Sequence, residues 1–177
     1  MTFHDFILWL NDSQFSVYLR ESEIAFPLTE ATHLIGIGIS VGMIMWIDLR
    51  LLGLTLRGEK VSDIVGRAEP WGIVGFVIMF VSGILLFLGK PETYWGTTTL
   101  KVKLVLMVAA GLNVWFFHTS VFPKVAKWDE GPTPLAAKLV GLSSLALWFI
   151  VIILGRWTAY YADPLYTGGI RTYLWFK

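Results

Sequence analysis

Cysteine is absent from the 177 residues of the sequence. Disulfides, thiolate metal sites, iron–sulfur clusters and covalently attached c-type haem all depend on cysteine, so the sequence excludes each of them. Charged residues are scarce as well: they make up 15% of the chain, whereas soluble domains usually carry about a quarter. The formal net charge is only +1, which gives no basis for binding nucleic acid.

The first residues also lack the features of a signal peptide. The stretch MTFHDFILWLNDSQ has neither a basic start nor a small-residue cleavage site. We therefore expect this stretch to stay in the folded protein.

Hydrophobic residues, by contrast, make up 55% of the chain, and its mean hydropathy is +0.65. Runs of about 20 apolar residues are typical of membrane-spanning helices. Four such runs predict spans over about residues 25–56, 70–89, 100–122 and 135–157. Short connections between them predict an all-α, up-and-down four-helix transmembrane bundle, one domain over residues 1–177, with both ends on one side. This composition excludes a water-soluble enzyme.

The segments before and after the four runs differ from the spans. Residues 1–23 hold two short amphipathic stretches, and Asp12 and Ser13 mark the expected start of the second helix. Several charged residues interrupt these stretches, so we expect helices at the membrane interface rather than a fifth span. Residues 158–177 are rich in tyrosine and tryptophan, which prefer the headgroup level, and predict an interfacial tail.

Proline and glycine suggest where the helices begin and how they pack. Pro70 is expected to open the second span, because a helix tolerates proline in its first turn. Gly38 and Gly42 form a small-xxx-small pair in the first span, which lets two membrane helices approach closely. The same packing role is expected for small residues of the second and fourth spans, namely Gly72, Gly75, Ser82, Gly83, Gly141, Ser144 and Gly155.

Ionisable side chains lie on one face of the first span. A helix turns about 100° per residue, which places Glu30, His33 and Asp48 within about 60° of one another. Lys103 and His118 mark a similar stripe on the third span. Unpaired charges are costly inside a membrane, so we expect the first and third spans to lie side by side with these stripes facing each other.

The depths of these residues predict two polar layers. The layer near the termini is expected to contain Glu30, His33, Lys103 and Arg156. The opposite layer is expected to pair Asp48 with His118, and Asn113 lies between the two layers. Such layers serve either as ion pairs that fix helix register or as the lining of a cofactor site or proton path, and the sequence leaves both open.

Two histidines in a four-helix membrane bundle suggest b-type haem. His33 and His118 differ in depth by roughly 18 Å, at 1.5 Å per residue, so we do not expect them to ligate one haem together. A haem with His33 as its single histidine ligand remains open, the other ligand being Lys103, Met43, Met45 or none. A metal ion on His33 with Glu30 would have too few protein ligands for tight binding, although a weakly held or transported copper ion remains open.

The order of motifs along the chain resembles a known family. The first span reads E-x-x-H-x-x-G followed by DLRLLGL, the second PWGIVGF, the third K-x-K-L-V-L-M-V-A-A-G-L-N-x-x-x-F-H, and the fourth SSLALW followed by GRWTAYY. Together they resemble a bacterial family of four-span membrane proteins of unknown function. The resemblance covers nearly the whole chain and implies the fold rather than a reaction.

A more distant likeness points to redox chemistry. HLIGIGISVG and LKVKLVLMVAAGLN are similar to the first and third spans of copper-resistance D-type proteins and of the four-helix membrane protoporphyrinogen oxidases, which bind haem. By position, this likeness implies that His33 is the histidine of the first span. Lys101 or Lys103 is then the basic residue that opens the third span.

These observations support two classes of function. The first is a haem- or metal-linked redox protein of the bacterial inner membrane, with His33 as the ligand. The second is a non-enzymatic accessory or structural subunit, or a small transporter-like protein, that associates with other subunits or with itself through glycine-rich faces in the bilayer. Whether the protein is an enzyme stays open. The distribution of lysine and arginine, with Lys103 and Arg156 discounted as lying within spans, predicts periplasmic termini.

Overall fold

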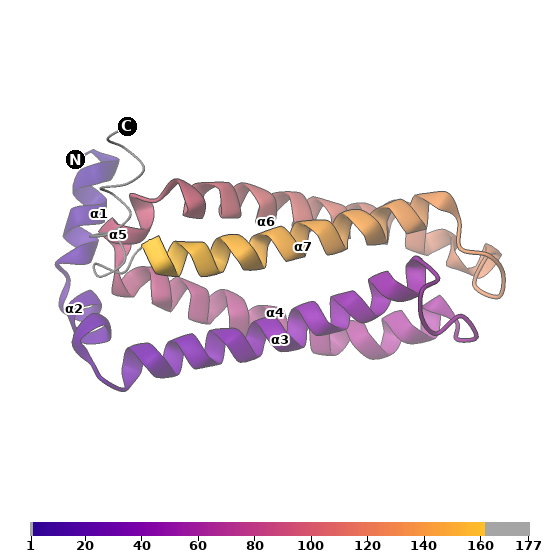
Figure 1. Cartoon of the computed structure of the whole chain (residues 1–177), viewed down its shortest axis with the longest axis horizontal. Coiled ribbons are helices and arrows are strands. Elements are labelled where there is room, and N and C mark those ends of the chain that lie inside the picture. The colour runs from indigo at the N-terminus through magenta and orange to yellow at the C-terminus, as the bar shows by residue number, and fades with distance from the viewer. Residues whose placement is uncertain (1, 162–177) are drawn as a thin grey trace.

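The computed structural model describes residues 2–161, and these residues form helices joined by short loops (Figure 1). Four helical segments are long and apolar enough to cross a membrane, which confirms the predicted all-α architecture. They are α3 (Ala25–Leu51), α4 (Val61–Gly89), α6 (Thr98–Phe116), which shorter helical turns prolong to Lys127, and α7 (Leu135–Tyr161). Most of the predicted interfacial tail, from residue 162 onward, lies outside the described residues.

The four helices form two hairpins. α3 packs most extensively against α4, α6 packs against α7, and α3 also contacts α7. The neighbours of α3 are therefore α4 and α7. The expectation that the first and third spans lie side by side was wrong, because α6 stands diagonally across the bundle from α3. Their inward faces can still meet across the bundle axis.

Short helices cover one end of the bundle, which we call the A end; the opposite end is the B end. α1 (Phe3–Asn11), α2 (Gln14–Glu21) and α5 (Pro91–Trp95) lie there (Figure 1). Ser13 caps α2 by accepting a hydrogen bond from the Ser16 backbone N–H, as the sequence predicted. Arg20 fixes α2 to the end of α4 by donating to the Gly89 carbonyl at 3.3 Å. α1 and α2 are too short to span a bilayer.

Two glycines bring the backbones of α3 and α4 together. A Cβ atom on Gly36 would lie 2.6 Å from the Met79 backbone nitrogen, and one on Gly75 would lie 2.5 Å from the Ser40 backbone nitrogen. Among residues 2–161, nothing lies within 4 Å of the corresponding position on either Gly38 or Gly42. Gly38 and Gly42 do not mediate the α3–α4 contact, because these residues lie about 200° and 240° around the helix from Gly36.

The first span is shorter than predicted. α3 ends at Leu51 rather than near residue 56 because Gly53 follows it with a left-handed φ of +71°. Gly53 N–H donates to the Arg50 carbonyl and Leu54 N–H to the Leu49 carbonyl, both at 3.0 Å. These two bonds form a Schellman motif, which stops a helix where glycine permits positive φ.

The second span begins earlier than predicted, at Val61, so Pro70 lies inside α4. The preceding segment is amphipathic: its buried residues are Val61, Ile64, Val65 and Ala68. This i, i+3, i+4, i+7 spacing is that of a helix face. The packing of this face outweighs the hydrogen bond that Pro70 removes.

The third span changes its helical form near its end. α6 is followed by a π-helical turn (Phe117–Val121) and a 3-10 turn (Phe122–Lys127). Pro123 lacks a backbone N–H, so the regular α-helical bond to Thr119 cannot form there. The Phe122 N–H instead reaches back to the Phe117 carbonyl, which is the pattern of a π-bulge. His118 lies within this altered turn.

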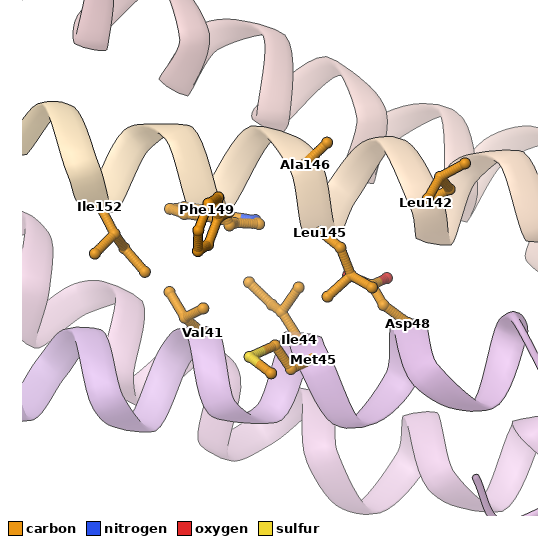
Figure 2. Close-up of a pocket in the computed structure, with 10 residues that line it drawn as sticks. Val41, Ile44, Met45, Asp48, Leu142, Leu145, Ala146, Phe149 and Ile152 are labelled. Atoms are coloured by element: carbon orange, nitrogen blue, oxygen red, sulfur yellow. The ribbon is translucent and has the colours of Figure 1, made fainter. Parts of the chain in front are cut away.

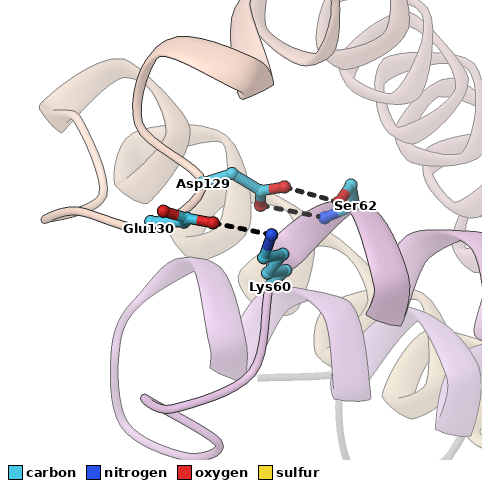
Figure 3. Close-up of polar contacts among 4 residues, drawn as sticks. All are labelled: Lys60, Ser62, Asp129 and Glu130. Atoms are coloured by element: carbon cyan, nitrogen blue, oxygen red, sulfur yellow. Dashed lines mark hydrogen bonds and ion pairs between the residues drawn. The ribbon is translucent and has the colours of Figure 1, made fainter.

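Polar contacts join the two loops of the B end (Figure 3). The Ser62 backbone N–H, at 3.1 Å, and the Ser62 hydroxyl both donate to the Asp129 carboxylate. Lys60 forms an ion pair with Glu130 at 2.7 Å, with side chains 51% and 78% exposed. Nearby, the buried Arg50 guanidinium donates to the Glu59 carbonyl at 2.8 Å. Asp129 thus supplies, from another loop, the N-terminal cap that α4 lacks in its own sequence.

Replacing Asp129 with alanine is expected to cost about 1 kcal/mol, because alanine has no side-chain acceptor and the helix cap is lost. Partial burial tends to raise the pKa of Asp129, but the hydrogen bonds from Ser62 outweigh it and hold this pKa below 3.8. The contribution of Asp129 to the free energy of unfolding is therefore complete above the pKa that Asp129 has in the unfolded chain. It is lost as the pH falls through the lower pKa that Asp129 has in the folded protein. Thermal melting in detergent at several pH values measures both effects.

Alanine at Lys60 or Glu130 is the control for this experiment. Exposed ion pairs contribute about 0–1 kcal/mol, so both variants should melt close to the unchanged protein. Equal destabilisation by the Lys60 and Asp129 substitutions would show that the cap is not the important contact.

Candidate functional site

His33 is held in one orientation between α3 and α4. Its Nδ1 lies 2.8 Å from the Met79 carbonyl oxygen and 3.1 Å from the Ser82 hydroxyl. A carbonyl oxygen only accepts, so Nδ1 carries the ring proton and Nε2 carries the lone pair. Gly83 makes room for the ring, since a Cβ there would lie 3.1 Å from the His33 Cε1. Within residues 2–161, both hydrogen bonds of the ring use Nδ1, which leaves Nε2 for a ligand.

Two charged residues lie around His33, as the sequence predicted for the layer near the termini. The charges of Lys103 and Glu30 both act on the His33 ring. The Lys103 ammonium rests on α7, where a Cβ on Gly155 would lie 3.2 Å from it. His33, Glu30 and Lys103 are all half-buried. Across the diagonal of the bundle, α3 and α6 therefore contribute opposite charges to one region at the A end.

Tyr94 of α5 is a member of this region that the sequence did not suggest. Burial raises the pKa of Tyr94 to about 12, and the negative charge of Glu30 adds to this effect. The phenol is therefore neutral at physiological pH and supplies a hydroxyl group near Glu30. Tyr94 falls in the connection between the predicted spans 70–89 and 100–122, where the structure has α5, a short helix at the A end.

Arg156 does not join this region. Its side chain is exposed and donates to the Tyr160 hydroxyl at 3.1 Å, with the guanidinium 4.5 Å from the centre of the Tyr160 ring. The depth of Arg156 was predicted from the sequence, but its direction was not. Tyr160, one turn further along α7, holds Arg156 on the outer face, where the cation interacts with the ring.

His118 pairs with Glu69 rather than with Asp48. Its Nε2 lies 3.6 Å from the Glu69 carboxylate on α4. His33 contacts Met79 of the same helix, ten residues from Glu69, so the two histidines lie about 15 Å apart along α4. This agrees with the separation expected from the sequence. The predicted pairing with Asp48 was wrong: the second span was expected to begin at residue 70, whereas α4 begins at Val61 and so brings Glu69 beside His118.

Asp48 is buried against α7. Its side chain is 4% exposed, and the hydroxyl of Ser144 is its hydrogen-bonding neighbour. A Cβ on Gly141 would lie 3.1 Å from the Asp48 carbonyl oxygen, so glycine allows α7 to approach α3 closely at this point. Within residues 2–161, Asp48 Oδ2 has no hydrogen-bond partner.

Asn113, expected between the two layers, joins α6 to α7. Its amide nitrogen donates to the Val140 carbonyl at 3.2 Å, and its amide oxygen accepts from the Ser143 hydroxyl at 3.0 Å. Both ends of the amide are therefore engaged between helices. These contacts give Asn113 a packing role in the fold.

The ligand geometry narrows the choice of cofactor. Among residues 2–161, no group of three or more histidine, aspartate or glutamate side chains could hold a metal ion. Met43 and Met45 follow His33 on the same helix at distances of about 15 and 18 Å, too far to ligate one iron with it. His33 and Lys103 remain as the candidate ligands from the sequence analysis.

Comparison with known proteins gives a family but no activity. A family model described as "Family of unknown function (DUF6644)" matches residues 8–161. The match includes all four membrane-spanning segments and every polar residue discussed above. No curated protein and no solved structure matches the chain.

Proposed function

The chain belongs to the DUF6644 family of unknown function, and from this premise we propose that it is a haem-binding redox protein of the bacterial inner membrane. In this proposal His33 Nε2 ligates the iron of a b-type haem. The four apolar helices make a multi-pass membrane protein. A haem would supply one-electron chemistry within the bilayer.

The observation that carries the proposal is the hydrogen bond between His33 Nδ1 and the Met79 carbonyl, 2.8 Å long. Histidines that bind metals usually donate their other ring N–H to a carbonyl or carboxylate, which fixes the tautomer and the ring orientation. His33 has this arrangement in the absence of any other partner for Nε2 within residues 2–161.

Haem suits this region better than a bare metal ion. A zinc or copper ion needs three or four protein ligands for tight binding, and His33 has no such partners among the described residues. Haem brings four nitrogen ligands of its own, so one histidine is sufficient. Lys103 could pair with a haem propionate, because its positive charge lies within range of His33.

A visible spectrum of the detergent-purified protein tests the proposal. We expect a Soret band in the unchanged protein and in His118→Ala, and on the order of tenfold or greater loss of bound haem in His33→Ala. Added imidazole should restore the band in His33→Gly. A colourless protein, or an unchanged band in His33→Ala, would overturn the proposal.

The proposal includes an orientation with the A end toward the periplasm. Because the sequence contains no cysteine, single cysteines at Asn11 and Gly58 can be labelled with a membrane-impermeant thiol reagent in whole cells. Labelling at Asn11 but not at Gly58 is the expected result. The reverse pattern would show that the A end faces the cytoplasm.

The alternative is an accessory or structural subunit, and one observation favours it. Gly38 and Gly42 are exposed on α3, and no atom of the described residues lies within 4 Å of a Cβ at either position. Such an open small-xxx-small pair suits packing against another membrane helix. Colourless protein that purifies as an oligomer, and becomes monomeric in Gly38→Leu, would favour this alternative over haem binding.

A further inference from the structure

Lys101 projects from the A end of α6 without a carboxylate partner. It is the fourth residue of this membrane-spanning helix, so it lies near the level of the lipid head groups. Its side chain is exposed. The ion pairs among residues 2–161 join Lys60 to Glu130 and His118 to Glu69. Within that part of the chain, no aspartate or glutamate neutralises the Lys101 ammonium.

Two aromatic rings lie beside this ammonium. Lys101 Nζ is 5.5 Å from the centre of the Trp95 ring, and the centres of the Trp95 and Phe3 rings are 4.9 Å apart. Trp95 belongs to α5 and Phe3 to α1, which crosses the A end beside the start of α6 (Figure 1). The contact with the ring favours one position of the cation. Since indole rings prefer the head-group level of a bilayer, these three residues have the composition of a site at the membrane interface.

An apolar stripe runs along α6 from Lys101 toward the B end. Val105, Val108 and Leu112, which we call the α6 stripe, all lie within about 40° of Lys101 around the helix. They are 69%, 64% and 59% exposed, so the stripe faces lipid. Lys101 and Leu112 are about 16 Å apart along the helix axis, close to the roughly 15 Å of hydrocarbon in one leaflet. One acyl chain therefore matches the length of the stripe.

A second lipid-facing surface lacks an exposed charge. A groove of about 350 Å³ lies between α3 and α7 (Figure 2), and most of its lining is apolar. Asp48 is the one ionisable group among the described residues that line it, and its side chain is only 4% exposed. The groove therefore has no group that distinguishes one lipid head group from another, whereas the α6 stripe ends at Lys101.

We propose that the outer face of α6 is a binding site for an anionic phospholipid, such as a phosphatidylglycerol. The phosphate accepts hydrogen bonds from the Lys101 ammonium, the glycerol backbone lies against Trp95 and Phe3, and one acyl chain follows the α6 stripe. Hydrogen bonds between two charged groups are the stronger ones, and a basic side chain at the membrane surface favours anionic lipid. In a zwitterionic lipid, the lipid's own ammonium competes with Lys101 for the phosphate. This inference does not rest on haem at His33.

Native mass spectrometry of the full-length protein in detergent tests the site, with dioleoyl phosphatidylglycerol as the probe. We expect saturable binding that weakens about fivefold in Lys101→Gln and severalfold in Trp95→Leu. Lys101→Arg keeps the positive charge and should bind the lipid as the unchanged protein does. Melting curves check that all three variants are folded.

Lys90→Gln is the matched control for charge. Lys90 also lies at the A end, but its ammonium is 5.2 Å from the centre of the Phe26 ring on α3, the helix diagonal to α6. This variant loses the same charge as Lys101→Gln and should keep its affinity for the lipid. Phe149→Leu is the control for apolar surface, because it alters an exposed ring of the groove without changing any charge.

Three results would overturn the proposal. The first is equal weakening by Lys101→Gln and Lys90→Gln, which would show a general attraction to anionic lipid. The second is equal affinity for dioleoyl phosphatidylethanolamine, or displacement of the lipid by millimolar inorganic phosphate. The third is a second copy of the chain cross-linked at Val108, which would show that protein rather than lipid covers the α6 stripe.

Discussion

Alanine at Gly36 or Gly75 is expected to lower the melting temperature of the detergent-purified protein by roughly 5 °C or more. At each position the added Cβ would lie within 2.6 Å of a backbone nitrogen of the partner helix. Backbone atoms cannot move aside as the end of a flexible side chain can, so α3 and α4 must separate. Overpacking of this kind costs about 1–3 kcal/mol, and each kcal/mol corresponds to about 2–4 °C in a protein of this size.

Alanine at Gly38 or Gly42 is the control within the same helix. In the part of the chain that the structure describes, nothing lies within 4 Å of a Cβ at either position, and alanine favours a helix over glycine by about 1 kcal/mol. These two variants should melt at the same temperature as the unchanged protein, or slightly higher. If all four alanine variants behaved alike, the close approach of α3 and α4 would not be the source of the effect.

Leu51→Ala is expected to produce the largest loss of stability, on the order of 10 °C in melting temperature. Leu51 is 1% exposed and packs at the B end in a cluster with Val61, Val65, Phe117, Val121, Ala137 and Val140. All four spans contribute to this cluster. Truncation of a buried leucine removes contacts and leaves a cavity, at a cost of about 2–5 kcal/mol.

Leu54→Ala provides the comparison, because Leu54 is 64% exposed just after the same helix. Its loss should change the melting temperature little. The visible spectrum of both variants should stay as in the unchanged protein, since the cluster is far from His33. Stronger destabilisation by Leu54→Ala than by Leu51→Ala would contradict the packing at the B end.

The spans could be predicted because their signal is local. A run of apolar residues long enough to cross a bilayer needs no knowledge of its neighbours. The beginning of α4 was missed because Pro70 was given more weight than the periodic burial of Val61, Ile64 and Ala68. The end of α3 was missed because Gly53 was not recognised as a helix stop.

The site was predicted in part, for a related reason. Depth follows from counting residues, and this was sufficient to bring Lys103 near His33. The direction of a side chain depends on which helices are neighbours, and counting residues along each span does not give the neighbours. For this reason two predicted contacts were wrong. Arg156 points outward, and His118 pairs with Glu69 instead of Asp48. The Met79 carbonyl, which orients His33, is a backbone group that no side-chain pattern can indicate.

The contact between Gly141 and Asp48 has a mechanical consequence. It pins α3 to α7 near the B end, where the loops are also tied together, and in Figure 1 the two helices diverge toward the A end. His33 lies fifteen residues from this pivot, a lever arm of about 22 Å. At this distance from the pivot, a rotation of one hairpin relative to the other by about 5° would displace the His33 imidazole by roughly 2 Å. The contact between Gly141 and Asp48 therefore acts as a pivot near the B end, and His33 lies toward the A end, where a rotation of one hairpin relative to the other produces the larger displacement.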